Sequence, residues 1–147
     1  MPSKVKLPGK LDNLHALMGF VTSYAAQQAF GGEKTAAIEL ALEEIFINII
    51  KHAYTERCIE GDIEVACWID GSKSLIIEIA DSGEFFDPFS IQNPDTTADI
   101  ENRRIGGLGI YFVKKIMDEV RYRRENDRNV LTLAISHSAS PEMDNRG

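Results

Sequence analysis

Apolar residues recur every three or four positions in two successive segments near the start of the chain, a spacing typical of helices that bury one face. The first segment predicts a helix from a capping residue, Asp12 or Asn13, to about Ala29. The glycines of the sequence FGGE then interrupt the pattern. A second helix is predicted from about Glu33 to Ala53, and its very apolar sequence, LALEEIFINIIKHAY, indicates that it is buried.

Alternation of apolar and polar residues predicts strands in three other segments. The sequence KVKLP, which ends at Pro8, predicts a short edge strand. Residues 60–83 predict a hairpin that turns at Gly71 and Ser72, with LIIEIA as its more buried strand. Residues 120–136 predict a second hairpin that turns within ENDRN.

The segment between the hairpins, residues 82–105, is polar and shows no period, so we expect a long functional loop. A third helix is predicted over residues 106–120, GGLGIYFVKKIMDEV, and residues 137–147 are expected to form a flexible tail. This order of elements predicts an α+β fold, a two-layer α/β sandwich with helices packed on one face of a mixed, mostly antiparallel sheet. We expect a single domain over residues 1–136.

Composition narrows the range of functions. The chain has 147 residues, 44% of them hydrophobic, which is enough for the core of one domain. Its net charge of -7 argues against direct binding to nucleic acid or to an anionic membrane surface. No apolar run reaches the roughly 18 to 20 residues of a membrane span, and the sequence MPSKVKLPGK lacks the apolar stretch of a signal peptide. We therefore expect a cytoplasmic protein.

The second predicted helix carries polar residues that a buried helix should avoid. Glu44 and Asn48 are four residues apart and share one face, and Lys51 and His52 follow one turn later. A carboxylate and an amide oxygen suit a hard cation such as Mg²⁺ with its waters. The alternative is that these groups pair with each other or with the backbone of a loop.

Two further motifs have the chemistry of a nucleotide site. In IADSGEFFDP, Asp81 ends an apolar strand and Gly83 permits a tight turn; this carboxylate could accept a hydrogen bond from the amino group of adenine, whereas guanine offers a carbonyl there. In RRIGGLGIYF, Gly106, Gly107 and Gly109 stand at a helix start, where unpaired N–H groups attract phosphate. Taken singly, the first motif also fits a simple turn and the second a hinge.

The three motifs together, in this order, resemble the GHKL or Bergerat ATP-binding fold that histidine kinases, gyrase B, Hsp90 and MutL share. The resemblance is strongest to the bacterial anti-sigma factor serine kinases of the RsbW and SpoIIAB type. EEIFINIIKHAY is similar to their N box, DSGEFFDP to their G1 box and GGLGIYFVKKIMDEV to their G2 box. The resemblance extends over nearly the whole chain, from KVKLP to LTLAIS.

This resemblance implies a role for each matching residue. Glu44 would be the general base and Asn48 the Mg²⁺ ligand, while Asp81 would bind the adenine amine with help from Gly83. The loop over residues 88–105 would be the ATP lid. The remaining residues implied to contact the nucleotide, most of them near its phosphates, are Lys51, His52, Arg103, Arg104, Gly106, Gly107, Leu108, Gly109 and, near the adenine, Thr132.

The same resemblance implies an ATP- and Mg²⁺-dependent serine/threonine kinase of bacteria. Such a kinase phosphorylates a STAS-domain anti-anti-sigma protein and sequesters a sigma factor, and it often pairs with a second copy of itself. Two alternatives remain open: a nucleotide-binding regulator without kinase activity, and a histidine-kinase-like ATPase module. The second would need a phosphoacceptor histidine with acidic and basic neighbours, which His15 in DNLHALMGF lacks.

Overall fold

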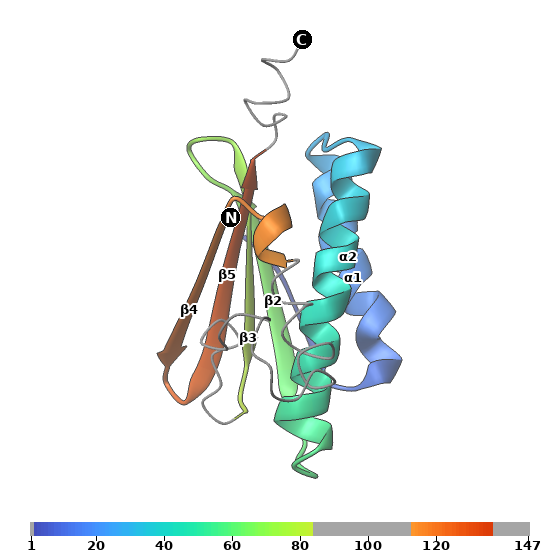
Figure 1. The fold of residues 1–147 in the computed structure, drawn as a ribbon, viewed down its shortest axis with the longest axis vertical. Coiled ribbons are helices and arrows are strands. Elements are labelled where there is room, and N and C mark those ends of the chain that lie inside the picture. The colour runs from blue at the N-terminus through green and yellow to red at the C-terminus, as the bar shows by residue number, and fades with distance from the viewer. Residues whose placement is uncertain (1, 84–112, 137–147) are drawn as a thin grey trace, which may run out of the picture.

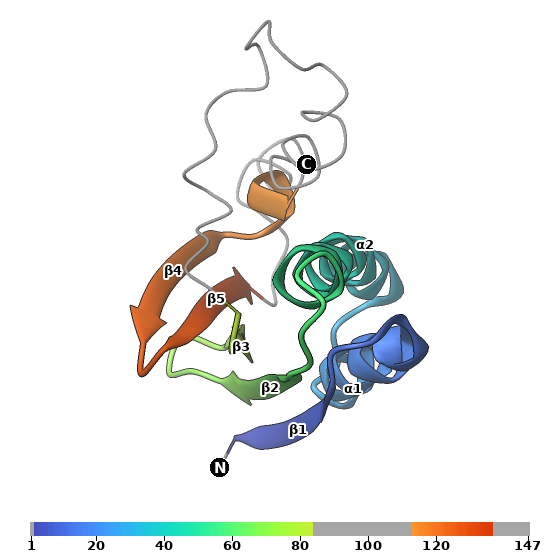
Figure 2. The same ribbon diagram turned by 90° about the horizontal axis from the view of Figure 1, so that it is seen from below.

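The computed structural model describes residues 2–83 and 113–136, which form a sheet with two long helices on one of its faces (Figures 1 and 2). The sheet has five strands in the order β1-β2-β3-β5-β4, and all four pairings are antiparallel. The strands are β1 Ser3–Pro8, β2 Asp62–Ile69, β3 Ser74–Asp81, β4 Glu119–Glu125 and β5 Arg128–Ser136. This architecture confirms the predicted α+β fold and the predicted edge position of β1.

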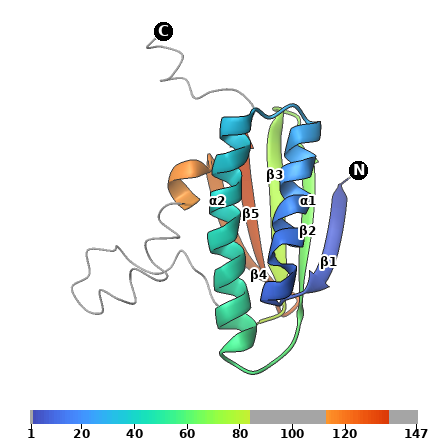
Figure 3. The ribbon, with the colours of Figure 1, turned by 90° about the vertical axis from the view of Figure 1, so that its right-hand side faces the viewer.

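The two helices run side by side across the sheet (Figure 3). The helical segments are η1 Leu11–Asn13, α1 Leu14–Gln27, α2 Gly32–Asn48 and η2 Ile49–Thr55. The predicted second helix therefore continues to its expected end, but η2 is a π-helix rather than an α-helix. Its wider turn is seen in the backbone bond from the Glu56 N–H to the Lys51 carbonyl oxygen, 2.8 Å long, which spans five residues.

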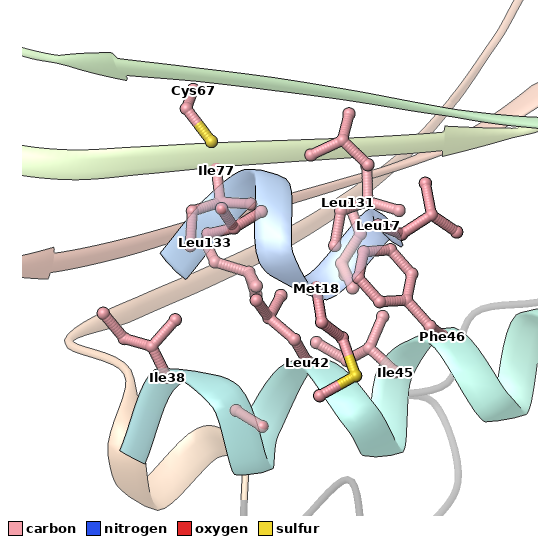
Figure 4. Close-up of a cluster of buried hydrophobic side chains, with 14 of the residues drawn as sticks. Leu17, Met18, Ile38, Leu42, Ile45, Phe46, Cys67, Ile77, Leu131 and Leu133 are labelled. Atoms are coloured by element: carbon pink, nitrogen blue, oxygen red, sulfur yellow. The ribbon is translucent and has the colours of Figure 1, made fainter. Parts of the chain in front are cut away.

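The hydrophobic core lies between the helices and the inner face of the sheet (Figure 4). Alternate residues of the strands point toward the helices, and residues three or four positions apart on the helices pack against them. The labelled side chains of this cluster are Leu17, Met18, Ile38, Leu42, Ile45, Phe46, Cys67, Ile77, Leu131 and Leu133. The pattern of apolar residues along the chain thus decides which face of each element is buried.

The predicted turn of the first hairpin at Gly71 and Ser72 is confirmed, and the predicted end of the third helix is wrong. The first hairpin turns over residues 70–73, where Asp70 Oδ1 accepts hydrogen bonds from the backbone N–H groups of Ser72 and Ser74, both 2.9 Å. The helix predicted to run to Val120 is helical only at residues 113–116 of its described part, and β4 begins at Glu119. The alternation of side chains along β4 explains this boundary, because Val120 and Tyr122 pack on the core while the charged residues that flank them, Glu119, Arg121 and Arg123, are exposed.

The predicted lid, the start of the glycine-rich helix and the predicted tail lie outside the described residues. Within residues 2–83 and 113–136, no helix is long and apolar enough to cross a membrane.

Candidate functional site

Asp81 lies in a row of paired residues that crosses four adjacent strands of the sheet. Asp81 ends β3 and pairs with Ile63 of β2 on one side and with Asn129 of β5 on the other. Asn129 in turn pairs with Arg124 of β4. Asp81 and Asn129 are buried, with 5% and 7% of their surfaces exposed, so the row places a carboxylate and an amide side by side at the helix-covered face.

The two oxygens of the Asp81 carboxylate have different surroundings. Oδ1 accepts a hydrogen bond from the Gly83 N–H at 2.8 Å and another from Asn129 Nδ2 at 3.0 Å. No group in the described part of the chain hydrogen-bonds to Oδ2. Burial raises the pKa of Asp81, and these two hydrogen bonds and the charges of Arg124 and Arg128 offset only part of that rise. A buried acceptor of this kind requires a donor, and an exocyclic amine would supply one.

Gly83 brings this strand end against the helical layer. A Cβ atom on Gly83 would lie 2.6 Å from the Cβ of Ala53, which is in η2, and 3.0 Å from Asp81 Oδ1. Only glycine permits so close an approach. The contact joins the segment from Asp81 to Gly83 to η2, which directly continues α2, the helix that carries Glu44 and Asn48.

Tyr54 fixes this junction from the other side. Its hydroxyl donates a 2.7 Å hydrogen bond to the Asp62 carbonyl oxygen and accepts one of 2.9 Å from the Ser82 N–H. Tyr54 is 3% exposed, and its ring lies so close to Gly9 and Gly61 that a Cβ on either would be 2.5 Å from ring atoms. Tyr54 therefore ties η2 to the residue that follows Asp81.

Replacing Tyr54 with Phe should lower the free energy of unfolding by about 1–3 kcal/mol, because the Ser82 N–H and the Asp62 carbonyl lose a buried partner. Chemical denaturation followed by circular dichroism measures this change. The matched control is Tyr24→Phe, since the Tyr24 hydroxyl hydrogen-bonds to no described residue. An equal, small effect of both substitutions would contradict the role given to Tyr54.

Asn48 is the last residue of α2 and is buried, with 7% of its surface exposed. No residue within 2–83 or 113–136 hydrogen-bonds to its side-chain amide. Glu44, one turn earlier, is half-buried and forms no ion pair with a described residue. Burial, and next the nearby charge of Glu43, raise the pKa of Glu44. Within the described residues, neither polar group therefore has the partner that the alternative interpretation of this helix requires.

Lys51 and His52 follow on η2 and are half-buried. His52 Nδ1 lies 2.9 Å from Glu56 Oε1, four residues further along the chain. This contact gives His52 a partner on its own helical segment. The structure thus places Glu44, Asn48, Lys51 and His52 on one continuous helical run that ends beside Gly83.

Thr132 is not brought to this site. It pairs with Glu78 in β3, three positions from the pair of Asp81 and Asn129, and an odd offset puts it on the opposite face of the sheet. Its hydroxyl lies 3.5 Å from Arg123 Nη1, and Arg123 also forms an ion pair with Glu78. The prediction that Thr132 lies near the adenine therefore does not fit the strand register.

The sequence-based interpretation missed Asn129. The signal was available, because Asn129 has the same phase as Leu131, Leu133 and Ile135, the inward-facing residues of β5. A polar residue at an inward position is costly unless it is hydrogen-bonded, and Asn129 bonds directly to Asp81.

The other predicted nucleotide contacts lie outside the described residues, namely Arg103, Arg104, Gly106, Gly107, Leu108 and Gly109. Across the described ranges, no group of three or more His, Cys, Asp or Glu side chains converges as a metal cluster. A cation at Asn48 would therefore need most of its oxygen ligands from a bound phosphate and water, which is how Mg²⁺ is commonly held.

A sheet with two helices on one face and a buried carboxylate at the end of a central strand is the form of a GHKL-type ATP-binding domain. Residues 7–135 match the family described as the histidine kinase-like ATPase domain, and the chain belongs to this family. Membership implies the use of ATP.

Relatives of known name share this length. The serine-protein kinase RsbW of Listeria monocytogenes is 29% identical over 143 residues, which cover 94% of this chain and 90% of the relative. The serine-protein kinase RsbW of Oceanobacillus iheyensis is 25% identical over 150 residues, with coverage of 96% and 89%.

Solved structures share the fold. The crystal structure of the RsbU and RsbW domains of Rv1364c from Mycobacterium tuberculosis matches with a TM-score of 0.67 and 16% identity, over 95% of this chain and 33% of that one. The histidine kinase domain of the blue-light activated kinase EL346 from Erythrobacter litoralis matches with a TM-score of 0.55 and 17% identity, over 84% and 61%.

Proposed function

We propose that this protein is an ATP-dependent serine/threonine protein kinase and anti-sigma factor. The observation that carries the proposal is that one helical run holds Glu44 and Asn48 and then packs against Gly83, beside the open oxygen of Asp81. Asn48 precedes Ala53 by five residues, about 7 Å along a helix axis. Asn48 therefore stands about one and a half turns, and Glu44 about two and a half turns, before the residue that contacts Gly83.

In this proposal the residues act in fixed roles. Asp81 Oδ2 accepts a hydrogen bond from the adenine amine, and the Asn48 amide oxygen holds Mg²⁺ together with the phosphates. When bound, the ion neutralises phosphate charge, which is the main requirement of phosphoryl transfer. Glu44 takes the proton of the attacking hydroxyl at its carboxylate, and its raised pKa makes it a stronger base.

The proposed phosphate contacts beyond Asn48 are expectations from the sequence. Lys51 and His52 follow Asn48 on the same helical run, and Arg103, Arg104 and the backbone N–H groups of residues 106–109 would complete the site. Helix N-termini and basic side chains are suited to a triphosphate.

The proposed partners are a STAS-domain anti-anti-sigma protein, whose serine or threonine receives the phosphate, and a sigma factor. The support is the similarity to relatives named serine-protein kinase RsbW. We expect this exchange in the bacterial cytoplasm.

A second copy of the chain is a further proposed partner. In the described part of the chain, the face of the sheet opposite α1 and α2 is not covered by a helix (Figure 2). The half-buried Trp68 and Ile76 lie on that face, on paired strands. Apolar side chains on an open sheet face suit the centre of a protein interface.

The test is incubation with labelled ATP, Mg²⁺ and candidate STAS-domain proteins, followed by identification of the phosphorylated residue by mass spectrometry. We expect label on a serine or threonine of one candidate. Binding of ATP without transfer to any candidate would instead favour a nucleotide-binding regulator. Label on a histidine of this chain would favour a histidine-kinase-like activity.

A further inference from the structure

A network of hydrogen bonds runs from the second hairpin, β4 and β5, to Asp81. Asn129 Oδ1 accepts hydrogen bonds from the Tyr122 hydroxyl at 2.6 Å and from Arg124 Nη1 at 3.1 Å. Asn129 Nδ2 donates to Asp81 Oδ1 at 3.0 Å. The same Arg124 Nη1 donates to the Gly83 carbonyl oxygen at 2.7 Å. Asp81 and Gly83 are thus both held from β4 and β5.

The donor and acceptor atoms of this network follow from the chemistry of its side chains. A guanidinium group only donates hydrogen bonds, so the atom of Asn129 that faces Arg124 must be its oxygen. The amide nitrogen of Asn129 must then face Asp81. A backbone N–H also only donates, so Asp81 Oδ1 receives two donors, from Asn129 and Gly83. Its acceptor capacity is therefore used within the protein, and Oδ2 remains.

The geometry of the second hairpin sets the positions of the residues in this hydrogen-bond network. Asn126 and Asp127 both have positive φ, 54° and 62°, as the tight turn that joins β4 to β5 requires. This turn sets the pairing of Arg124 with Asn129, and the neighbouring ladder sets the pairing of Asn129 with Asp81. Three consecutive strands therefore place donor, relay and carboxylate in one row.

We propose that Asn129, oriented by Tyr122 and Arg124, is a positioning residue that presents Asp81 Oδ2 to the nucleobase and so sets the preference for a 6-amino purine. The inference rests on the proposed nucleotide site at Asp81. A 6-amino group donates to Oδ2, whereas a 6-carbonyl group faces the same oxygen with a second acceptor. If the Asn129 amide is removed, Asp81 loses a donor that fixes it, and Arg124 loses an acceptor that keeps it away from the carboxylate. The carboxylate then no longer presents one open oxygen in one direction.

The test measures the affinities of the protein for ATP and for inosine triphosphate, which differ at position 6 of the base, by isothermal titration calorimetry. The unaltered protein should prefer ATP. Asn129→Leu, which is close to Asn in size, should reduce the ratio of the two affinities by about tenfold, the loss expected for one hydrogen bond to a charged group. A purely structural role would weaken both nucleotides equally and leave the ratio unchanged, and that result would overturn the proposal.

Two further variants test the proposal if Asn129→Leu does not fold. Arg124→Met removes the donor that orients Asn129, and Arg121→Met removes the same charge from the opposite face of the same strand, where Arg121 pairs with Glu119. Only Arg124→Met should reduce the preference for ATP. If the ratio of the affinities for ATP and inosine triphosphate is the same in these two variants, the proposed role of the hydrogen-bond network is overturned. If the unaltered protein binds neither nucleotide, or binds both equally, the site at Asp81 itself is refuted, and the inference with it.

Discussion

A Glu44→Ala variant should bind ATP as tightly as the unaltered protein and should transfer phosphate more slowly by roughly 10²- to 10⁴-fold, the contribution expected of a general base. The half-buried carboxylate has no ion-pair partner in the described part of the chain, so its removal leaves no charge unpaired. Binding is measured by calorimetry and transfer by labelled phosphate on the substrate protein. Transfer at an undiminished rate would show that Glu44 is not the base.

The control for this experiment is Glu39→Ala, which removes an exposed carboxylate from the same helix and should leave transfer unchanged. The pH dependence supplies a second check. Because the pKa of Glu44 is raised, its carboxylate protonates at a higher pH than an ordinary glutamate as the solution is acidified. The acid limb of the transfer rate should therefore lie above the usual glutamate range and should be absent from Glu44→Ala.

An Asp81→Asn variant should bind ATP about 10- to 100-fold more weakly while keeping its fold. The substituted amide oxygen can still accept hydrogen bonds from the Gly83 N–H and from Asn129 Nδ2, as Oδ1 does. Its nitrogen then stands at the position of Oδ2 and faces the adenine amine donor with another donor, a mismatch that costs about 1–3 kcal/mol. Unchanged affinity in calorimetry would contradict the assignment of Asp81.

A measurement of stability distinguishes weaker ATP binding by Asp81→Asn from unfolding of the variant. Burial raises the pKa of Asp81, so the ionised carboxylate opposes folding once the pH rises through its ordinary range to the raised value. A neutral asparagine does not carry that cost, and the free energy of unfolding at neutral pH should not fall. Asp127→Asn, in the exposed turn between β4 and β5, is the matched control and should leave ATP binding unchanged.

The fold follows closely from patterns along the chain. The alternation of Ile63, Val65 and Cys67 correctly gives the buried face of β2, and the helical spacing of Leu14, Leu17 and Val21 gives the buried face of α1. Each pattern is local, and each reports the period of the element itself. The helix-to-strand boundary near Glu119 was misplaced because a short apolar run fits both periods.

The candidate site depends on long-range pairing that local patterns do not determine. The sequence predicts Glu44, Asn48 and Asp81 as site residues because a polar group in an apolar segment is conspicuous whatever strand or helix the segment packs against. Thr132 was misassigned because its face depends on the register of β5 against β3, and a shift of one residue reverses every side chain. Asn129 required the same register. The π-helical turn after Asn48 has no sequence signal of its own, since it adjusts the helix end so that Tyr54 and Ala53 meet the β3 end.

The measurement that tests the central claim most directly is a crystal structure of the protein with a non-hydrolysable ATP analogue and Mg²⁺. We expect the adenine amine about 3 Å from Asp81 Oδ2, the ion bound by the Asn48 amide oxygen, and the γ-phosphate on the side of Glu44. A nucleotide bound elsewhere, or bound here with its base away from Asp81, would contradict the account.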